Sequence, residues 1–245
     1  MKVIVTNSYD ETCAVIANMI KELVNAKPDA KLGLATGGTP VPIYKKLIEM
    51  NEAGEVDFSR VHTVNLDEYC GIPGTHDQSY RYFMDTNLFD HINIDKKNTF
   101  VASGMGDFEA NARELEEKVR EGGAADLQLL GIGNNGHIAF NEASDHLIAV
   151  AHTEKLTEST INANARFFEK KEDVPTMAIT MGMGDILAAK KVVLAATGLA
   201  KVPAIKGLIM DDVITTQNPS TMLKMHEDAV VVIDRELADA VGYRA

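Results

Sequence analysis

Residues 127–142 read LQLLGIGNNGHIAFNE, a short apolar run that passes directly into a glycine-rich turn. The run Leu127–Gly131 is typical of a strand within a sheet, and the turn opens with the pattern Gly-x-Gly-x-x-Gly. Glycines let a backbone turn sharply and come close to a ligand. The stretch therefore predicts a strand whose end carries a functional loop.

Short runs of this kind recur on both sides of the stretch, separated by longer amphipathic segments. Strands are expected at Lys2–Thr6, Lys31–Ala35, Val61–Asn65, Thr99–Ala102, Leu127–Gly131, Thr176–Thr180, Val192–Ala196 and Val230–Ile233. Helices are expected at Thr12–Asn25, Pro40–Met50, Ser79–Leu88, Phe108–Glu121, Gly184–Lys190, Val202–Met210 and Arg235–Ala240. Strands that alternate with helices predict a Rossmann-like α/β fold, an open, mostly parallel sheet with helices on both faces.

The composition sets the class of protein. The 245 residues are 45% hydrophobic and 24% charged, with no internal repeat or flexible linker, so we expect a single domain over residues 1–245. A formal net charge of −12 argues against nucleic acid or an anionic membrane as a general partner. The two widely spaced cysteines, Cys13 and Cys70, form no metal motif, and neither a signal peptide nor an apolar span is evident. A cytoplasmic location is expected.

In such sheets, ligands bind beyond the carboxyl ends of the strands, usually where the strand order switches direction. One turn of this kind is Ala35–Pro40, which reads ATGGTP. We expect Thr39 to cap the following helix and Pro40 to take its first position. The free N–H groups there would receive a phosphate. An ordinary strand-to-helix turn is the alternative, and no Gly-Lys-Ser/Thr follows that would make it a P-loop.

Two adjacent carboxylates close another strand, in the stretch Asn65–Tyr69, which reads NLDEY. Asp67 or Glu68 could serve as a general base if it is partly desolvated and its pKa is raised. Solvated loop acids or a helix N-cap are the alternatives, and the stretch taken alone favours them.

The glycine-rich turn after Leu127–Gly131 has two interpretations. A dinucleotide site is one, since Glu154 lies near the spacing of a ribose-binding acid. However, the motif follows the fifth expected strand instead of opening the first βα unit, and the bulky His137 comes directly after its last glycine. His137 within five residues of Glu142, flanked by amides, is more typical of proton-transfer machinery.

The stretch Glu154–Lys171 has mixed charge and weak periodicity, which suits a mobile cover over a site. Arg166 within it, and Lys201 after another expected strand, are candidate partners for a dianionic group. Each one alone is more typical of an ordinary surface cation.

Together these motifs resemble the glucosamine-6-phosphate deaminases (isomerases), in particular the short bacterial type, nearly from end to end. The matching stretches are ATGGTP (35–40), NLDEY (65–69), LGIGNNGHIAFNE (130–142) and ARFF (165–168), of which the third is highly specific. The resemblance implies the fold of that family and the conversion of glucosamine 6-phosphate and water into fructose 6-phosphate and ammonia, in amino-sugar catabolism. It also implies that neither a metal nor an organic cofactor takes part.

The resemblance assigns roles to particular residues. Asp67 would move the proton between C2 and C1, and His137 would open the pyranose ring with the help of Glu142 and Asn135. The phosphate would be held by Gly38, Thr39, Arg166 and Lys201. These roles suit the chemistry, because a single carboxylate can take and return the proton of an aldose–ketose isomerisation. Ring opening moves a proton between two oxygens, which suits a histidine.

Two departures from the family pattern stand out. Many members carry Asp where this chain has Asn135, and the usual Pro after Asn-Glu is Ala143 here. Asparagine can orient His137 but cannot stabilise an imidazolium by charge. Allosterically activated hexameric relatives also use an Arg-x-Lys pair soon after the catalytic loop, and the corresponding stretch here is His152–Glu154.

Three alternatives stay open. A 6-phosphogluconolactonase shares the fold and the Gly-His loop, but its histidine is typically followed by a run unlike the one found here. A deaminase for an epimeric amino-sugar phosphate would use the same residues. The fold also serves as the effector-binding module of sugar-responsive repressors, which need an added DNA-binding domain. The partner expected is thus a small sugar phosphate; a homo-oligomer is possible, since members occur as monomers and as hexamers.

Overall fold

The computed structural model describes residues 1–165 and 168–244. Seven strands form a parallel sheet in the order β1-β10-β9-β6-β2-β3-β5, and a small antiparallel sheet has the order β4-β8-β7. The strands are β1 (Lys2–Thr6), β2 (Lys31–Leu34), β3 (His62–Asn65), β4 (Asp67–Tyr69), β5 (Thr99–Phe100), β6 (Leu127–Leu130), β7 (His152–Lys155), β8 (Met177–Thr180), β9 (Val192–Ala196) and β10 (Ala229–Asp234).

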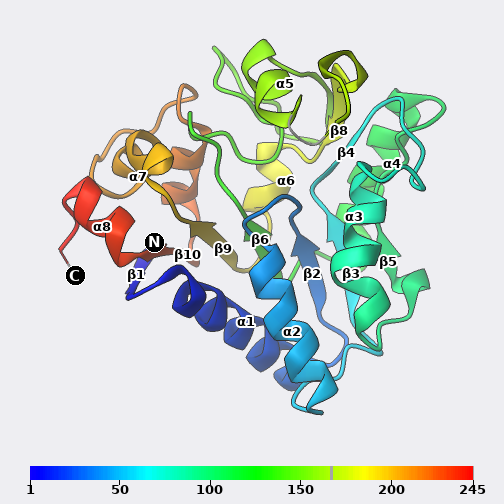
Figure 1. Ribbon diagram of the computed structural model, residues 1–245, viewed down its shortest axis with the longest axis horizontal. Coiled ribbons are helices and arrows are strands. Elements are labelled where there is room, and N and C mark those ends of the chain that lie inside the picture. Colours follow the sequence, from blue (N-terminus) through cyan, green and yellow to red (C-terminus); the bar gives the residue numbers. More distant parts are fainter. Residues whose placement is uncertain (166–167, 245) are drawn as a thin grey trace.

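Helices cover both faces of the large sheet (Figure 1). They are α1 (Tyr9–Ala26), α2 (Val41–Glu52), α3 (Tyr80–Asn87), α4 (Phe108–Arg120), α5 (Glu158–Asn164), α6 (Met183–Leu187), α7 (Val202–Ile209) and α8 (Arg235–Val241). Helix α1 shows why such segments are helical: the Ser8 hydroxyl accepts the N–H of Glu11, whose carboxylate accepts the N–H of Asn7 in return. One free N–H group of the first helical turn, and the N–H of the residue before the cap, are thereby satisfied.

Alternate residues of the central strands feed two separate cores, as strand geometry requires. On β9, Val192 and Leu194 pack with residues of α4, α6, α7 and α8. Val193 and Ala195 point the other way and pack with residues of α1, α2 and α3. Burial on both faces explains the continuous apolar runs of these strands, and the expected α/β fold with a mostly parallel sheet is confirmed.

The strand order switches direction between β2 and β6. From β2 the chain proceeds outward through β3 to β5, whereas from β6 it proceeds the opposite way through β9 to β10. The loops that follow β2 and β6 are therefore neighbours, and Thr39, Gly131 and Ala195 line one small hollow beside the ends of β2, β6 and β9. This is the position at which open α/β sheets bind ligands.

The structure corrects part of the expected layout. The segment Thr176–Thr180 was expected in the main sheet, but its strand β8 lies between β4 and β7 in the small antiparallel sheet. The sequence pattern did not predict β4, β7 or α5, because these elements are short and polar, and α5 falls in the stretch expected to be a mobile cover. In Figure 1, α5 lies at the top of the view with β4 and β8 beside it. Among the described residues, no helix has the length and apolar character that crossing a membrane requires.

Candidate active site

The expected site residues other than Arg166 follow the carboxyl ends of four adjacent strands, β9, β6, β2 and β3. Residues at the end of β8 connect the segment after β3 with the loop after β6. Thr180 of β8 pairs with Asp67 in the small sheet, and its hydroxyl accepts the N–H of Phe140 at 3.2 Å. The neighbouring Met181 donates its N–H to the Leu66 carbonyl and accepts the side-chain amide of Asn141. The loop after β6 is thus fastened beside the acidic pair.

Asp67 is a buried carboxylate, 7% exposed. Within residues 1–165 and 168–244, no side chain or backbone group donates a hydrogen bond to it. Burial, with a further contribution from the negative charge of Glu68, raises the pKa of Asp67 to about 8. A carboxyl group in this environment holds a proton more readily than one in water, as a group that takes and returns a proton should.

Glu68 has the opposite surroundings, although it is the next residue. Its carboxylate accepts the backbone N–H groups of Tyr69, Tyr80 and Arg81 at 2.8 to 3.0 Å. Burial raises its pKa to about 7, and the three amides act against that rise. Two of these amides belong to the first turn of α3, so the expected alternative of a helix-capping acid describes Glu68.

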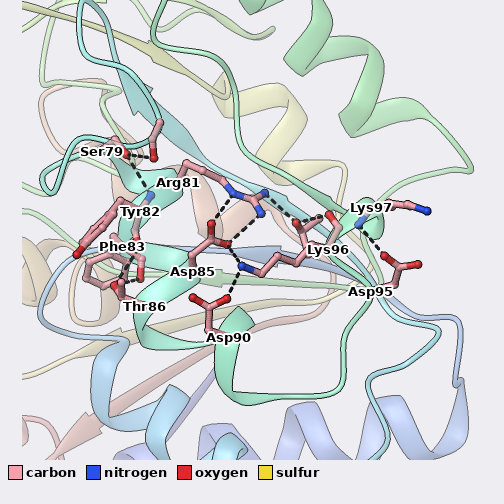
Figure 2. A network of polar contacts seen from close by, with 12 residues as sticks. Ser79, Arg81, Tyr82, Phe83, Asp85, Thr86, Asp90, Asp95, Lys96 and Lys97 are labelled. Carbon is pink, nitrogen blue, oxygen red and sulfur yellow. Dashed lines mark hydrogen bonds and ion pairs between the residues drawn. The ribbon is translucent and has the colours of Figure 1, made fainter.

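An ionic network on α3 keeps that helix end in place (Figure 2). Arg81 binds Asp85 through two nitrogens, at 3.1 and 2.9 Å, and donates to the Thr99 hydroxyl at 2.9 Å. Lys96 lies between Asp85 and Asp90 and pairs with both. Because the α3 amides that hold Glu68 belong to this braced turn, Glu68 stabilises the local structure and Asp67 is left as the carboxylate available for chemistry.

The loop after β6 brings Asn135, His137 and Glu142 into direct contact. The Asn135 amide nitrogen donates to Glu142 Oε2 at 2.9 Å, so the Asn135 oxygen must face the histidine. That oxygen lies 2.7 Å from His137 Nδ1 and accepts the His137 N–H at 3.2 Å. Since the oxygen can only accept, Nδ1 carries a proton, which leaves Nε2 of a neutral His137 as the acceptor for a substrate proton.

Two glycines of the Gly-x-Gly-x-x-Gly pattern make room for side chains of the protein itself. A Cβ on Gly133 would lie 2.2 Å from Cε1 of the His137 ring, so only glycine allows the ring to rest there. Gly136 has φ 85°, and a Cβ there would meet the Asn218 side chain at 1.9 Å. Ala139 also has a positive φ of 53°, a conformation that L residues rarely adopt. These contacts explain both glycines without a dinucleotide and favour the proton-transfer interpretation of the loop.

Glu142 is held as an ion. It is 8% exposed, and burial by itself would raise its pKa. The hydrogen bond and charge of His137, together with donors from Thr160 and Asn135, outweigh burial and lower the pKa of Glu142 to about 2. Its Oε2 lies 3.5 Å from His137 Nδ1. Asn135, His137 and Glu142 form one connected relay that leaves Nε2 of His137 at its open end.

The turn after β2 is shaped by its backbone. Gly37 has φ 93°, and two tyrosine hydroxyls hold the turn, that of Tyr44 on the Ala35 carbonyl at 2.6 Å and that of Tyr9 on the Thr39 carbonyl. Gly38 is exposed and Thr39 half-buried. Thr39 was expected to cap the next helix, but α2 begins at Val41 and its N-cap is Pro40, one residue later than the sequence predicted. The N-cap makes no side-chain hydrogen bond to α2, and because Pro40 and Pro42 have no N–H, Val41 and Ile43 carry the first N–H groups of this helix.

Of the two cations expected to bind the phosphate, the structure describes Lys201. Lys201 is half-buried and ends a short 3-10 helix (Leu199–Lys201) that follows Gly198, whose φ is 86°. Gly198 and Thr197 follow β9, and the Thr197 hydroxyl is tied to Asp234. Arg166 lies outside the described residues. Among those described, no group of three or more His, Cys, Asp or Glu side chains is arranged to hold a metal ion.

Sequence reasoning missed two residues of this region. Thr160 donates its hydroxyl to Glu142 Oε1, and Thr180 joins Asp67 to the loop after β6. Neither threonine belongs to a motif, and both come from elements whose position depends on the antiparallel sheet. The only sequence signal for either threonine is the start of α5, because Thr157 precedes this helix as a typical N-cap residue and accepts the N–H of Thr160.

Comparison with known proteins shows the family to which this chain belongs. A family model described as glucosamine-6-phosphate isomerases/6-phosphogluconolactonase matches residues 6–232. A glucosamine-6-phosphate deaminase of Clostridium beijerinckii is 53% identical over 242 residues, which cover 98% of this chain and 100% of that protein. One of a Thermoanaerobacter species is 49% identical over 242 residues, covering 98% of this chain and 95% of that protein.

Among solved structures, a deaminase is more similar to this chain than a lactonase is. A monomeric glucosamine-6-phosphate deaminase superposes with a TM-score of 0.94 at 39% identity, covering 98% of this chain and 100% of that one. A 6-phosphogluconolactonase from Thermotoga maritima superposes with a TM-score of 0.75 at 19% identity, over 96% of this chain and 99% of that one. The second similarity shows a shared fold only.

Proposed function

The chain belongs to the family of glucosamine-6-phosphate isomerases and 6-phosphogluconolactonases, and we propose that within it the chain is a glucosamine-6-phosphate deaminase. The family resemblance read from the sequence motifs is confirmed. The reaction converts glucosamine 6-phosphate and water into fructose 6-phosphate and ammonia. What supports this choice over the lactonase is the sequence similarity to the deaminases, at about half of all positions over nearly the full chain.

Substrate binding begins with the phosphate. We assign it to the open N–H groups around Gly38 and Thr39, with Lys201 and Arg166 supplying positive charge. A chain of net charge −12 repels a dianion in general, so the local amides and cations must outweigh that field. These contacts are remote from the reacting carbons and fix the position of the sugar.

Ring opening follows at His137. Nε2 takes the proton of the anomeric hydroxyl, the bond between C1 and the ring oxygen breaks, and the ring oxygen receives a proton. The Nδ1 proton stays on the Asn135 oxygen, which keeps the imidazole in one tautomer. The ionised Glu142 lies 3.5 Å from Nδ1 and stabilises the imidazolium that forms in between.

Isomerisation follows at Asp67. The ionised form of Asp67 removes the C2 proton of the open-chain aldehyde while O1 takes up a proton from solvent, which gives an enolamine, and Asp67 then returns its proton to C1. The product is an iminium at C2; water adds to it, and ammonia and one proton leave, which balances the proton taken up by O1. One carboxylate on one face of the substrate serves both transfers, and the raised pKa of Asp67 makes it a stronger base for the first of them.

We also propose a cytoplasmic location, because Cys13 and Cys70 are free and buried, which is the use of cysteine typical of a reducing compartment.

The observation that carries the proposal is the pairing of a relay built on His137 with a separate buried carboxylate, Asp67, that has no hydrogen-bond donor among the described residues. Ammonia release from glucosamine 6-phosphate is the test. Parallel assays with galactosamine 6-phosphate and 6-phosphogluconolactone separate the epimeric deaminase and the lactonase. Hydrolysis of the lactone without ammonia release from either amino sugar would contradict the proposal.

A further inference from the structure

Glu142 has two carboxylate oxygens, and different parts of the chain hold them. Oε2 accepts the side-chain amide of Asn135, from the loop after β6. Oε1 accepts the hydroxyl of Thr160, which lies 18 residues further along the chain, on α5. Thr160 is 8% exposed, so water does not replace that donor readily.

We propose that Thr160 is a positioning residue of the ring-opening relay, holding Glu142 ionised and oriented toward Asn135 and His137. The inference rests on the proposed function, because it takes Glu142 as the partner of His137 in ring opening. Thr160 itself touches neither the imidazole nor any position assigned to the substrate.

The direction of the Thr160 hydroxyl follows from its other contacts. Thr157, the N-cap of α5, accepts the N–H of Thr160 at 3.2 Å and lies 3.0 Å from the Thr160 hydroxyl, to which it donates. A hydroxyl has one proton to give. Since the Thr160 oxygen receives a proton from Thr157, its own proton is directed at Glu142. The two threonines and the carboxylate form a chain with one polarity.

Apolar contacts fasten α5 over the same loop. Leu156, just before the helix, belongs to a buried cluster with Phe140 and Tyr69, and Ile161 of α5 packs against that cluster. Phe140 is two residues before Glu142, and Tyr69 is two residues after Asp67. The seating of α5 is therefore linked to both proposed catalytic carboxylates.

The test compares Thr160→Val, which keeps the shape and removes the hydroxyl, with Thr160→Ser, which keeps the hydroxyl. We expect the valine variant to lose roughly tenfold in kcat on the cyclic substrate, with KM changed by less than about threefold. The loss should be smaller on an open-chain analogue, which bypasses ring opening. Thr160→Ser should recover most of the rate.

A matched control is Thr153→Val, because the half-buried Thr153 on β7 also donates its hydroxyl to a glutamate, Glu109, that the proposed mechanism does not use. This variant should keep wild-type kcat on both substrates. Thermal unfolding of each variant shows whether the fold is retained. Equal losses on the cyclic and open-chain substrates, or a serine variant as slow as the valine variant, would overturn the positioning role.

A carboxyl NMR titration of glutamate-labelled protein, with the Glu142 signal assigned by its disappearance in Glu142→Gln, asks the question without turnover. Loss of the Thr160 donor should move the Glu142 titration upward by about one pH unit. An unmoved titration would overturn the inference. If the unaltered chain releases no ammonia, the proposed function fails, while the titration still decides whether Thr160 keeps Glu142 ionised.

Discussion

Two buried carboxylates, Asp67 after β3 and Glu142 after β6, have different proposed roles: Asp67 is the base of the isomerisation, and Glu142 supports His137 in ring opening. Their exposed fractions are nearly equal, at 7% and 8%. Burial acts on both in the same direction, yet the pKa of Asp67 is raised to about 8 and that of Glu142 is lowered to about 2. The deeper burial of Asp67 contributes to this difference, and so do the partners of the two groups.

Asp67 has a neighbouring negative charge and no hydrogen-bond donor among the described residues, whereas Glu142 has three side-chain partners, His137, Asn135 and Thr160. A carboxyl group without donors exchanges its proton near neutral pH, and one with several donors stays an ion. On the proposed mechanism, different surroundings thus make a base of one carboxylate and an electrostatic support of the other.

The largest expected effect tests the Asp67 side of this comparison. Asp67→Asn keeps the size of the side chain but removes the proton acceptor, so turnover should fall by roughly 10²–10⁴. Substrate should still bind, because the phosphate contacts are untouched. Ammonia release and KM for glucosamine 6-phosphate measure both parts.

Glu68→Gln is the control for the neighbouring acid. Its amide group would face backbone N–H groups that now meet a carboxylate, so thermal stability should drop, while turnover of the folded protein stays within about tenfold. Normal turnover in Asp67→Asn with a dead Glu68→Gln variant would reverse the two assignments.

The next effect concerns the relay side. His137→Gln removes the group that moves the ring-opening proton, so turnover on the cyclic substrate should fall by roughly 10²-fold or more, and by less on an open-chain analogue. The ratio of the two rates is the measurement. An equal loss on both substrates would place His137 in the isomerisation step beside Asp67.

The two carboxylates should change the free energy of unfolding with opposite dependence on pH. Folded Asp67 keeps its proton up to about pH 8, whereas the unfolded group loses it near pH 4, so wild-type stability falls as pH rises through that window. Asp67→Asn should therefore be more stable than the wild type, with a gain that is absent near pH 4 and grows toward pH 8, reaching about 1–3 kcal/mol.

Glu142→Gln should show the reverse. The folded carboxylate ionises near pH 2 and the unfolded one near pH 4.5, so its stabilising contribution is complete above pH 4.5 and is lost as pH falls toward 2. The variant should be less stable than the wild type at pH 7 by about 1–3 kcal/mol, and the deficit should shrink in acid. Urea unfolding at pH 4, 6 and 8 checks both signs, and equal shifts in the two variants would remove the contrast.

The sequence was sufficient for the main sheet and for the residues at its edge. Apolar runs such as Val192–Ala196 predict strands buried on both faces, and glycine-rich turns mark where those strands end. The positions of Asp67, Asn135, His137 and Glu142 follow from that layout together with the family resemblance.

The small sheet could not be read in the same way. β7 reads HTEK and β4 reads DEY, and neither alternates apolar and polar residues over enough positions to predict a strand. Their pairing with β8 depends on tertiary contacts between distant segments. The contacts that make the pKa values of Asp67 and Glu142 differ, including that of Thr160, depend on this pairing and on the docking of α5. The pKa contrast therefore could not be predicted from the motifs.

A smaller effect is expected at Asn135. Asn135→Asp should keep activity within about tenfold, and the added negative charge should stabilise the protonated imidazole and move the pH–rate profile to higher pH. The structure adds a cost, because the new carboxylate would replace an amide that donates to Glu142 at 2.9 Å. A pH–rate profile identical to that of the wild type would show that residue 135 does not govern His137.

The smallest expected effect is no effect, and it concerns a third carboxylate, Glu154. N-Acetylglucosamine 6-phosphate should not activate this chain, and its kinetics should be hyperbolic with or without that compound. Activated relatives use an Arg-x-Lys pair where this chain has His152 and Glu154, and these two side chains lie 3.4 Å apart on one face of β7. Rate curves at several substrate concentrations, with and without the acetylated sugar phosphate, are the measurement.

A one-residue shift toward Lys155 does not rebuild the activator site. Lys155 lies on the opposite face of β7 from Glu154, because neighbouring strand residues point to opposite sides. On that face Thr153 is bound to Glu109, so an acid is present there as well. A phosphate dianion meets a carboxylate on either face, and an effector that binds no state preferentially shifts no equilibrium. Sigmoidal kinetics that become hyperbolic when the compound is added would show that another part of the chain forms the effector site.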